Sequence, residues 1–205
     1  MIDFYTSSTG NGRRAAIALE ECGLAHTVHR LDLAKGDAKQ PSFLKINPAG
    51  MIPVIIDPAG PGGKAITVTQ SGAIVLYCAE KSGKLLPKDP VRRIEAYEWF
   101  MQGATDLAPS SSALFYASTH APDKSAANMA YYQQRFLANC AIADARLKGR
   151  DFFAADFSIA DVTVYPVALA RKAVIDEAPG LANFKAWMAR VAARPAIAKA
   201  LAANG

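Results

Sequence analysis

A glycine-containing segment near the start of the chain carries the first residues whose types and spacing could do chemistry. The segment Ser8–Ala15, STGNGRRA, contains the pattern Gly10-x-Gly12-x-x-Ala15 at the head of a helical pattern. The first turn of a helix presents free N–H groups and the positive end of the helix dipole, so it attracts anions. Three uses remain open: binding the phosphates of a dinucleotide, stabilising a thiolate, or forming a plain turn.

The dinucleotide hypothesis has one further observation in its favour. Asp32 lies about 20 residues beyond the glycines, where an acidic residue would bind a ribose. A full dinucleotide fold, however, needs two β-α-β-α-β halves. This chain supplies four strand patterns followed only by helical ones, so the sequence disfavours a nucleotide.

The thiolate hypothesis uses the side chains beside the same helix start, where Thr9 offers a hydroxyl donor and Asn11 an amide donor. Lowering a thiol pKa from about 8.5 by about two units makes most of it thiolate at pH 7 and needs roughly 2.7 kcal/mol. A helix end contributes about 0.3 to 2 kcal/mol and a charge-assisted hydrogen bond about 1.5 to 3 kcal/mol. The segment holds no cysteine, so the sulfur must come from a ligand; Ser7 and Ser8 are the alternative donors.

Two later segments narrow the choice of ligand. Ile52-Pro53 follows a turn, and a cis peptide there would direct the backbone of Ile52 outward to pair with an extended peptide. A trans proline that begins a strand is the alternative. Gln70 and Ser71 open a helical pattern, where they offer a hydroxyl and free N–H groups to a carboxylate or simply cap the helix. Together the three segments indicate a peptide that carries one thiol and carboxylates.

The elements that must position these residues are of two kinds. Residues 1–81 alternate strand and helix signals in the order β-α-β-α-β-β-α. We expect strands over 1–6, 26–33, part of 47–57 and 65–69, and helices over 11–22, 41–46 and 70–81.

The strand signals end after residues 82–90, SGKLLPKDP, which we interpret as a linker. Residues 91–205 are expected to form an all-α domain. Its helical signals are the stripe Ile94, Tyr97, Met101 and Ala104, a helix over 126–147, a capping box from Ser158 to Asp161, and a stripe that ends at Arg194-Pro195.

Composition excludes several classes of protein. The chain has 23 lysines and arginines and 18 acidic residues, which gives a net charge of +5. The basic residues are scattered along the sequence, and this argues against binding of nucleic acid. No secretory signal and no run of about 18 apolar residues occurs, so we expect a cytoplasmic protein with no membrane partner. Cys22, Cys78 and Cys140 are far apart in the sequence, so we expect each of them to be a small buried hydrophobic residue. His26 and His29 face opposite sides of a strand, so no metal site is expected.

The chain resembles the cytosolic glutathione transferases over essentially its whole length. INPAGMIPVI and QSGAIVLYCAEK are similar to that family's thioredoxin-like glutathione domain, and FFAADFSIADVTVYP to the capping-box segment of its helical domain. The resemblance implies a cis Pro53, pairing of Ile52 with the cysteine of glutathione, and binding of the γ-glutamyl end by Gln70 and Ser71. It also implies glutathione as co-substrate and a homodimer.

The first segment, MIDFYTSSTGNGRR, is similar to the Nu class, in which a threonine and an asparagine of a T-P-N-G loop lie near the sulfur. Thr9 and Asn11 match those residues, and Gly10 replaces the proline. YEWFMQGATDLAPSSSALF and DARLKGRDFFAADFSIAD look more like the bacterial Beta class. That class has a cysteine in the first loop and a histidine at the position of Ala108, so Beta-type cysteine chemistry is not expected. Tyr5 lies within a strand pattern and is interpreted as structural.

The leading hypothesis is an enzyme in which Thr9 and Asn11 stabilise a glutathione thiolate that attacks an electrophilic carbon or a disulfide. The Nu-class resemblance favours disulfide reduction, in which two glutathiones supply both sulfurs. The competing hypothesis is a transferase-like module that binds glutathione, a hydrophobic ligand or a protein without turnover. Lys35 or Lys39 could bind the glycine carboxylate, and the candidates for the second-substrate pocket are Phe100, Tyr116 and Tyr131.

Overall fold

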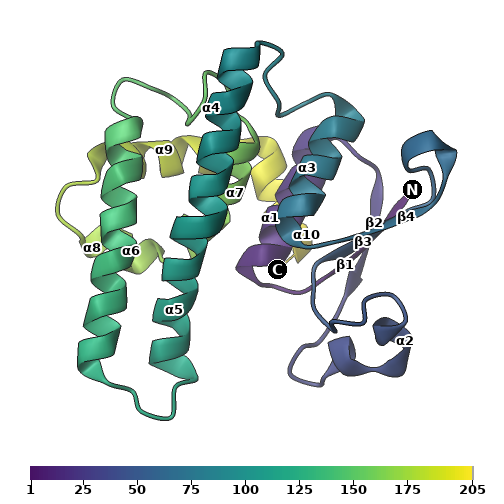
Figure 1. Cartoon of the computed structure of the whole chain (residues 1–205), viewed down its shortest axis with the longest axis horizontal. Coiled ribbons are helices and arrows are strands. Elements are labelled where there is room, and N and C mark those ends of the chain that lie inside the picture. Colours follow the sequence, from purple (N-terminus) through teal and green to yellow (C-terminus); the bar gives the residue numbers. More distant parts are fainter. Residues whose placement is uncertain (205) are drawn as a thin grey trace. The chain divides into compact units, whose positions relative to one another are not determined.

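The computed structural model describes residues 1–204 and divides into two compact units (Figure 1). The first unit contains residues 1–86 together with the C-terminal segment that begins at Arg194. The second unit is Pro87–Ala193. Its first residues belong to the segment that the sequence marks as a linker, 82–90.

The first unit is built on a mixed sheet of four strands. These are β1 (Ile2–Thr6), β2 (His26–Arg30), β3 (Val54–Asp57) and β4 (Ile66–Thr69), in the spatial order β2-β1-β3-β4. β2 runs parallel to β1, whereas β3 is antiparallel to both β1 and β4. This is the thioredoxin-like arrangement, and it lacks the second parallel half that a dinucleotide fold requires.

Helices cover both faces of this sheet. The helices are α1 (Gly10–Cys22), α2 (Pro41–Leu44) and α3 (Ser71–Ser82), with single 3₁₀ turns at Asp37–Lys39 and Pro61–Gly63. Tyr5 and Val54 oppose each other in the β1–β3 register and pack against Phe43 of α2. Side chains alternate along a strand, so Phe4 and Ile55 face the opposite side, toward α1 and α3 (Figure 1). The expected element order β-α-β-α-β-β-α is confirmed.

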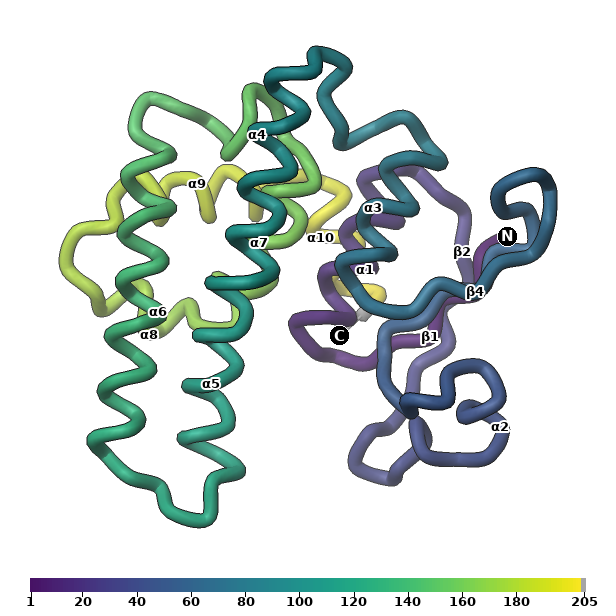
Figure 2. Tube along the Cα trace, viewed as in Figure 1, coloured from purple at the N-terminus to yellow at the C-terminus, as the bar shows by residue number. Residues whose placement is uncertain are grey.

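The last helix, α10 (Pro195–Asn204), belongs to the first unit and lies beside α1 (Figure 2). The Glu21 carboxylate on α1 receives two hydrogen bonds from Arg194, at 2.6 and 2.7 Å. Ile197 and Ala200 are fully buried. The expectation of one helical domain over 91–205 therefore needs correction, because these contacts hold α10 in the unit that contains α1.

The second unit is all helical. Its elements are α4 (Pro90–Met101), a π-helical segment η3 (Gln102–Leu107), α5 (Ala108–Thr119), α6 (Ala126–Arg146), α7 (Ile159–Ala170), α8 (Lys172–Glu177) and α9 (Ala182–Ala192). α4, η3 and α5 follow one another without a break. Within η3, a Cβ on Gly103 would lie 2.9 Å from a methyl group of Val164 on α7, so the close approach of the two helices requires glycine.

The apolar stripe that predicts α4 does not face the core. Ile94 is 65% exposed and Met101 is 50% exposed, whereas Trp99 and Phe100 are buried. The sequence therefore predicts the helix correctly but not the side on which it packs. The aromatic residues set that side, because Trp99 stacks on Phe153 with a distance of 4.7 Å between the ring centroids.

The predicted capping box is present at the start of α7. The Ser158 hydroxyl accepts the N–H of Ala160, while the Asp161 carboxylate accepts the N–H of Ser158 at 3.0 Å. The same carboxylate accepts the indole N–H of Trp187 at 2.8 Å and the backbone N–H of Phe153 at 3.3 Å. Burial raises the pKa of Asp161 to about 6, although these hydrogen bonds favour its ionised form.

The three cysteines are free thiols in the core. Cys22, Cys78 and Cys140 are buried, as the sequence predicts, and burial raises the pKa of each thiol. They are therefore poor nucleophiles. None of the helices within residues 1–204 combines the length and the hydropathy that a membrane span requires. The same range contains no group of histidine, cysteine and acidic side chains that could hold a metal ion.

Candidate active site

Thr9 and the first turn of α1 form one side of the candidate site. Thr9 is the N-cap residue, with an extended backbone (φ −123°, ψ 162°), and its hydroxyl oxygen accepts the N–H of Gly12 at 3.0 Å. A hydroxyl that accepts one hydrogen bond can still donate its own proton. Thr9 can therefore cap the helix and donate to an anion at the same time.

Asn11 links the start of α1 to the start of α3. Its side-chain oxygen accepts a hydrogen bond from Nη1 of Arg14 at 3.0 Å and one from the Ser71 hydroxyl at 3.3 Å. Asn11 itself is exposed, so its amide group lies at the surface of the site. The structure thus brings together two segments that the sequence predicts separately as a thiolate site and a carboxylate site.

Arg14 is the functional candidate that the sequence reasoning missed. Its side chain is only 5% exposed, and Nη1 also donates to the Ser71 hydroxyl at 2.8 Å. Burial lowers the pKa of Arg14 to about 10, so it remains a cation at neutral pH. The sequence signal was the spacing of three residues between Asn11 and Arg14, which places both on one face of a helix.

The start of α3 is the second candidate anion site, in the same unit. Ser71 is the buried first residue of α3, and Gln70 before it has φ +68°, a left-handed conformation that is rare for a residue other than glycine. Such strain is concentrated at ligand-binding positions. The first N–H groups of a helix have no partner within the helix, so they can bind a carboxylate beside Gln70 and Ser71.

The loop before β3 presents a free length of backbone. The Ile52–Pro53 peptide is cis, as predicted, and Pro53 is buried. The Asn47 amide donates to the carbonyl of Met51 at 2.7 Å and so holds the loop. Among residues 1–204, none pairs with the backbone N–H or carbonyl of Ile52, so an extended peptide can pair with both.

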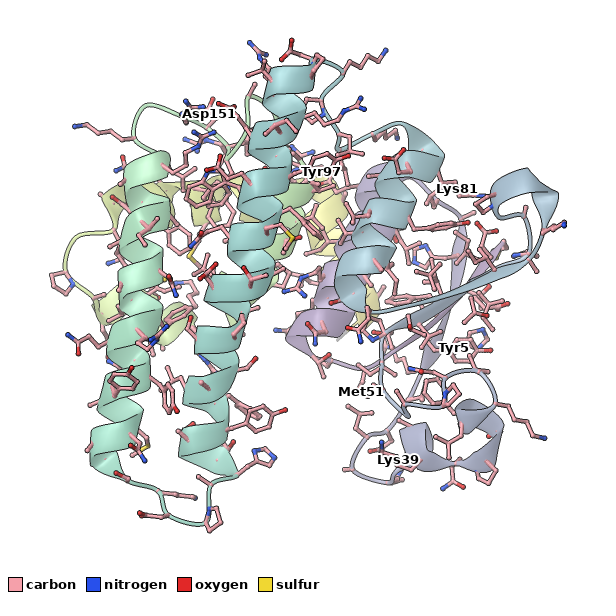
Figure 3. All side chains as sticks on the ribbon, in the orientation of Figure 1. Tyr5, Lys39, Met51, Lys81, Tyr97 and Asp151 are labelled. Carbon is pink, nitrogen blue, oxygen red and sulfur yellow. The ribbon has the colours of Figure 1, made fainter. Side chains whose placement is uncertain are left out.

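The structure separates the two lysine candidates. Lys39 donates to the carbonyl of Ala49 at 3.3 Å, and a Cβ on Gly50 would lie 2.7 Å from its Nζ. Lys39 therefore lies against the loop that leads to Met51 and Ile52 (Figure 3). Lys35 is 80% exposed and forms an ion pair with Asp32 at 3.2 Å.

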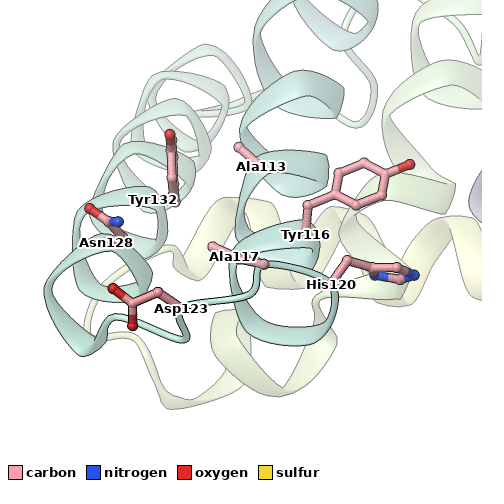
Figure 4. A pocket seen from close by; sticks show the side chains of 8 residues that line it. Ala113, Tyr116, Ala117, His120, Asp123, Asn128 and Tyr132 are labelled. Atoms are coloured by element: carbon pink, nitrogen blue, oxygen red, sulfur yellow. The ribbon is translucent and has the colours of Figure 1, made fainter.

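The three aromatic candidates for the second-substrate pocket differ in their exposure. Phe100 is buried in α4, whereas Tyr116 on α5 and Tyr131 on α6 are more than half exposed. Between α5 and α6 lies a pocket of about 430 Å³ (Figure 4). Tyr116 and Tyr132 line this pocket, and Tyr131 is not among its lining residues. Its other lining residues are Ala113, Ala117, His120, Ala121, Asp123 and Asn128.

Both parts of the chain match family models. Residues 11–81 match the model of the glutathione S-transferase N-terminal domain. Residues 108–195 match that of the C-terminal domain. The chain is also 32% identical to the disulfide-bond oxidoreductase YfcG of Escherichia coli, over 98% of this chain and 94% of that protein. It is 28% identical to the disulfide-bond oxidoreductase YghU of the same organism, over 99% of this chain and 75% of that protein.

Solved structures agree with these matches. One is a glutathione transferase from Pseudomonas putida with one glutathione disulfide bound per subunit. It superposes on this chain with a TM-score of 0.91 at 30% sequence identity, and the match covers 100% of this chain and 92% of the Pseudomonas chain. A glutathione transferase from Burkholderia graminis with two glutathione molecules bound per subunit superposes with a TM-score of 0.88 at 31% sequence identity. That match covers 98% of this chain and 87% of the Burkholderia chain. The sequence, the fold and the start of α1 thus lead to one conclusion: this chain belongs to the glutathione S-transferase family.

Proposed function

We propose that this protein is a glutathione-dependent enzyme in which the start of α1 stabilises the glutathione thiolate for attack on a disulfide. The observation that carries the proposal is the set of donors at one helix end: the Thr9 hydroxyl, the Asn11 amide and the first N–H groups of α1, with the Arg14 cation behind them. The protein's own thiols are buried, so the reacting sulfur is the ligand's.

The reaction needs no protein nucleophile. A glutathione thiolate attacks one sulfur of the disulfide, forms a mixed disulfide and releases the other sulfur as a thiolate. A second glutathione thiolate attacks the glutathione sulfur of the mixed disulfide, which gives glutathione disulfide and the second product thiolate. Two glutathiones are oxidised and one disulfide is reduced. YfcG and YghU are named disulfide-bond oxidoreductases, and this supports disulfide reduction over conjugation to carbon.

The remaining residues of the site would hold the tripeptide. We assign the backbone of Ile52, after the loop that Asn47 holds, to the cysteine of glutathione. Gln70 and Ser71 would bind the γ-glutamyl carboxylate at the start of α3, and Lys39 the glycine carboxylate. Pro53 serves by setting the direction of the Ile52 backbone.

We further propose a Nu-like first loop, a homodimer and a cytoplasmic location. Thr9 and Asn11 support the class assignment. The dimer is supported by Val91, Ile94 and Met101, which lie along one side of α4 and are 71%, 65% and 50% exposed, because an exposed apolar stripe marks an interaction surface. The cytoplasmic location is supported by the three cysteines, which are free and form no disulfide among the described residues.

Two assays on the purified protein test the proposed reaction. We expect glutathione-dependent reduction of hydroxyethyl disulfide to exceed conjugation of chlorodinitrobenzene. Strong conjugation with negligible disulfide reduction would contradict the choice of reaction. Glutathione binding by calorimetry without either activity would instead favour a binding module.

Lys39→Ala is expected to raise the KM for glutathione by about 1.5- to 5-fold with little change in kcat, because Lys39 is exposed and an exposed ion pair contributes about 0.2 to 1 kcal/mol. Steady-state kinetics with varied glutathione measures the effect. Lys35→Ala removes the same charge from a lysine that pairs with Asp32, so it is the matched control. Equal effects of the two substitutions would remove Lys39 from the site.

A further inference from the structure

A buried cation joins the two anion-binding ends of the site. Arg14 places one guanidinium nitrogen, Nη1, 3.0 Å from the side-chain oxygen of Asn11 and 2.8 Å from the hydroxyl of Ser71. Asn11 stands at the start of α1 and Ser71 at the start of α3. One side chain therefore contacts both helix starts from the buried side.

This contact determines which way the Asn11 amide faces. A guanidinium has only donors, so the atom of Asn11 that faces it must be the amide oxygen. The Ser71 hydroxyl, at 3.3 Å from the same oxygen, can donate to it while accepting from Arg14. With its oxygen held by two donors, Asn11 must turn its NH₂ group away from Arg14. Without Arg14, an exposed amide could turn its oxygen outward, and an oxygen repels a thiolate.

We propose that Arg14 is a positioning residue that holds Asn11 with its amide nitrogen toward the glutathione sulfur and ties this orientation to Ser71. The inference rests on the proposed function, since it assumes that Asn11 donates to the sulfur. It assigns Arg14 no contact with the reacting atoms. Its effect on the reaction passes through Asn11, and this distinguishes it from a cation that only attracts the ligand.

The adjacent arginine provides a matched control. Arg13 has the same charge, lies one residue earlier on α1 and donates to the Ser8 hydroxyl at 3.4 Å. Arg13→Met and Arg14→Met therefore make the same chemical change at positions that differ in their contact with Asn11. We expect Arg14→Met to lower turnover by about 10- to 100-fold and Arg13→Met by less than about 2-fold.

A double-mutant cycle of Arg14→Met and Asn11→Ala tests whether one residue acts through the other. In the wild-type background, Asn11→Ala is expected to lower turnover by about 10-fold or more; in the Arg14→Met background, by less than about 2-fold. The thiolate absorbance of bound glutathione near 240 nm should show the same pattern, a readout that a loss of stability alone would not produce.

The outcomes separate the inference from the function that underlies it. If both single substitutions lower turnover and their effects multiply, Arg14 does not act through Asn11 and the inference fails. If Asn11→Ala leaves turnover and thiolate absorbance unchanged, the assignment of Asn11 in the proposed function fails. Thermal unfolding checks each variant. If Arg14→Met does not fold, Arg14→Gln takes its place in the same cycle, because glutamine keeps a donor for Ser71 but can also accept and so no longer fixes the Asn11 oxygen.

Discussion

Replacing Thr9 by valine together with Asn11 by alanine will lower turnover by about 100- to 1,000-fold, the effect expected when preorganised donors to a reacting anion are lost. The affinity for glutathione should fall much less, because the backbone of Ile52 and the start of α3 still hold the peptide. Steady-state kinetics and calorimetry measure the two quantities on the same preparations.

The valine also removes the hydroxyl that caps α1 through Gly12, at a cost of about 1 kcal/mol of stability. Thr9→Ser is the control, since it keeps a hydroxyl that can both cap and donate. It should retain most of the turnover. If the double substitution left turnover unchanged, the donor to the glutathione sulfur would have to be Ser7 or Ser8 in the same loop.

Asp161→Asn will lower the free energy of unfolding by about 2 to 4 kcal/mol at about pH 7, where the Asp161 carboxyl is ionised, because a buried hydrogen-bond network is broken. One Asp161 oxygen accepts from Trp187 and Phe153, and the other accepts from Ser158. An amide replaces one oxygen with an NH₂ group, so a donor must face a donor at either position. Urea unfolding measures the loss.

The difference in the free energy of unfolding between wild type and Asp161→Asn decreases as the pH rises. Burial raises the folded-state pKa of Asp161 to about 6, above the value near 3.9 of an unfolded chain. The folded protein therefore binds the proton more tightly, and the associated stability is complete below about pH 4 and lost as the pH rises through 6. The gap between wild type and Asp161→Asn should shrink over that range by up to about 3 kcal/mol. Ser158→Ala keeps the carboxylate but removes a hydroxyl that donates to it at 3.2 Å and lowers its pKa, so the stability gap between wild type and this variant should widen as the pH rises.

Local patterns made much of the fold and part of the site predictable. The glycines at the head of α1, the turn before Pro53 and the capping box at Ser158 are signals within a few residues, and each lies where the sequence predicts. Thr9, Asn11, Ile52 and Ser71 could be chosen because helix starts and turns have a known chemistry. The approach of Asn11 to Ser71 could not be derived from either segment alone.

The features that the sequence did not predict depend on contacts between distant segments. Arg14 is one of the scattered basic residues in the sequence, whereas in the structure it is buried and contacts Ser71 at the start of α3. The Glu21–Arg194 pair likewise joins α10 to α1 across most of the chain. No local pattern marks either contact.

The aromatic candidates show a different limit. Tyr131 and Tyr132 are adjacent on α6, and neighbouring side chains on a helix point about 100° apart, so only the packed structure shows which of them lines the pocket. Phe100 is a sequence-based candidate for the pocket wall, and it is buried in the core next to Trp99. Residue type alone does not separate a wall of a pocket from a core side chain.

Titration of glutathione bound to the protein, followed by thiolate absorbance, tests the central claim most directly. If the start of α1, Thr9 and Asn11 stabilise the thiolate, the midpoint for bound glutathione will lie at least about one pH unit below that of free glutathione, equivalent to about 1.4 kcal/mol. An identical midpoint for the bound and the free tripeptide would contradict the account.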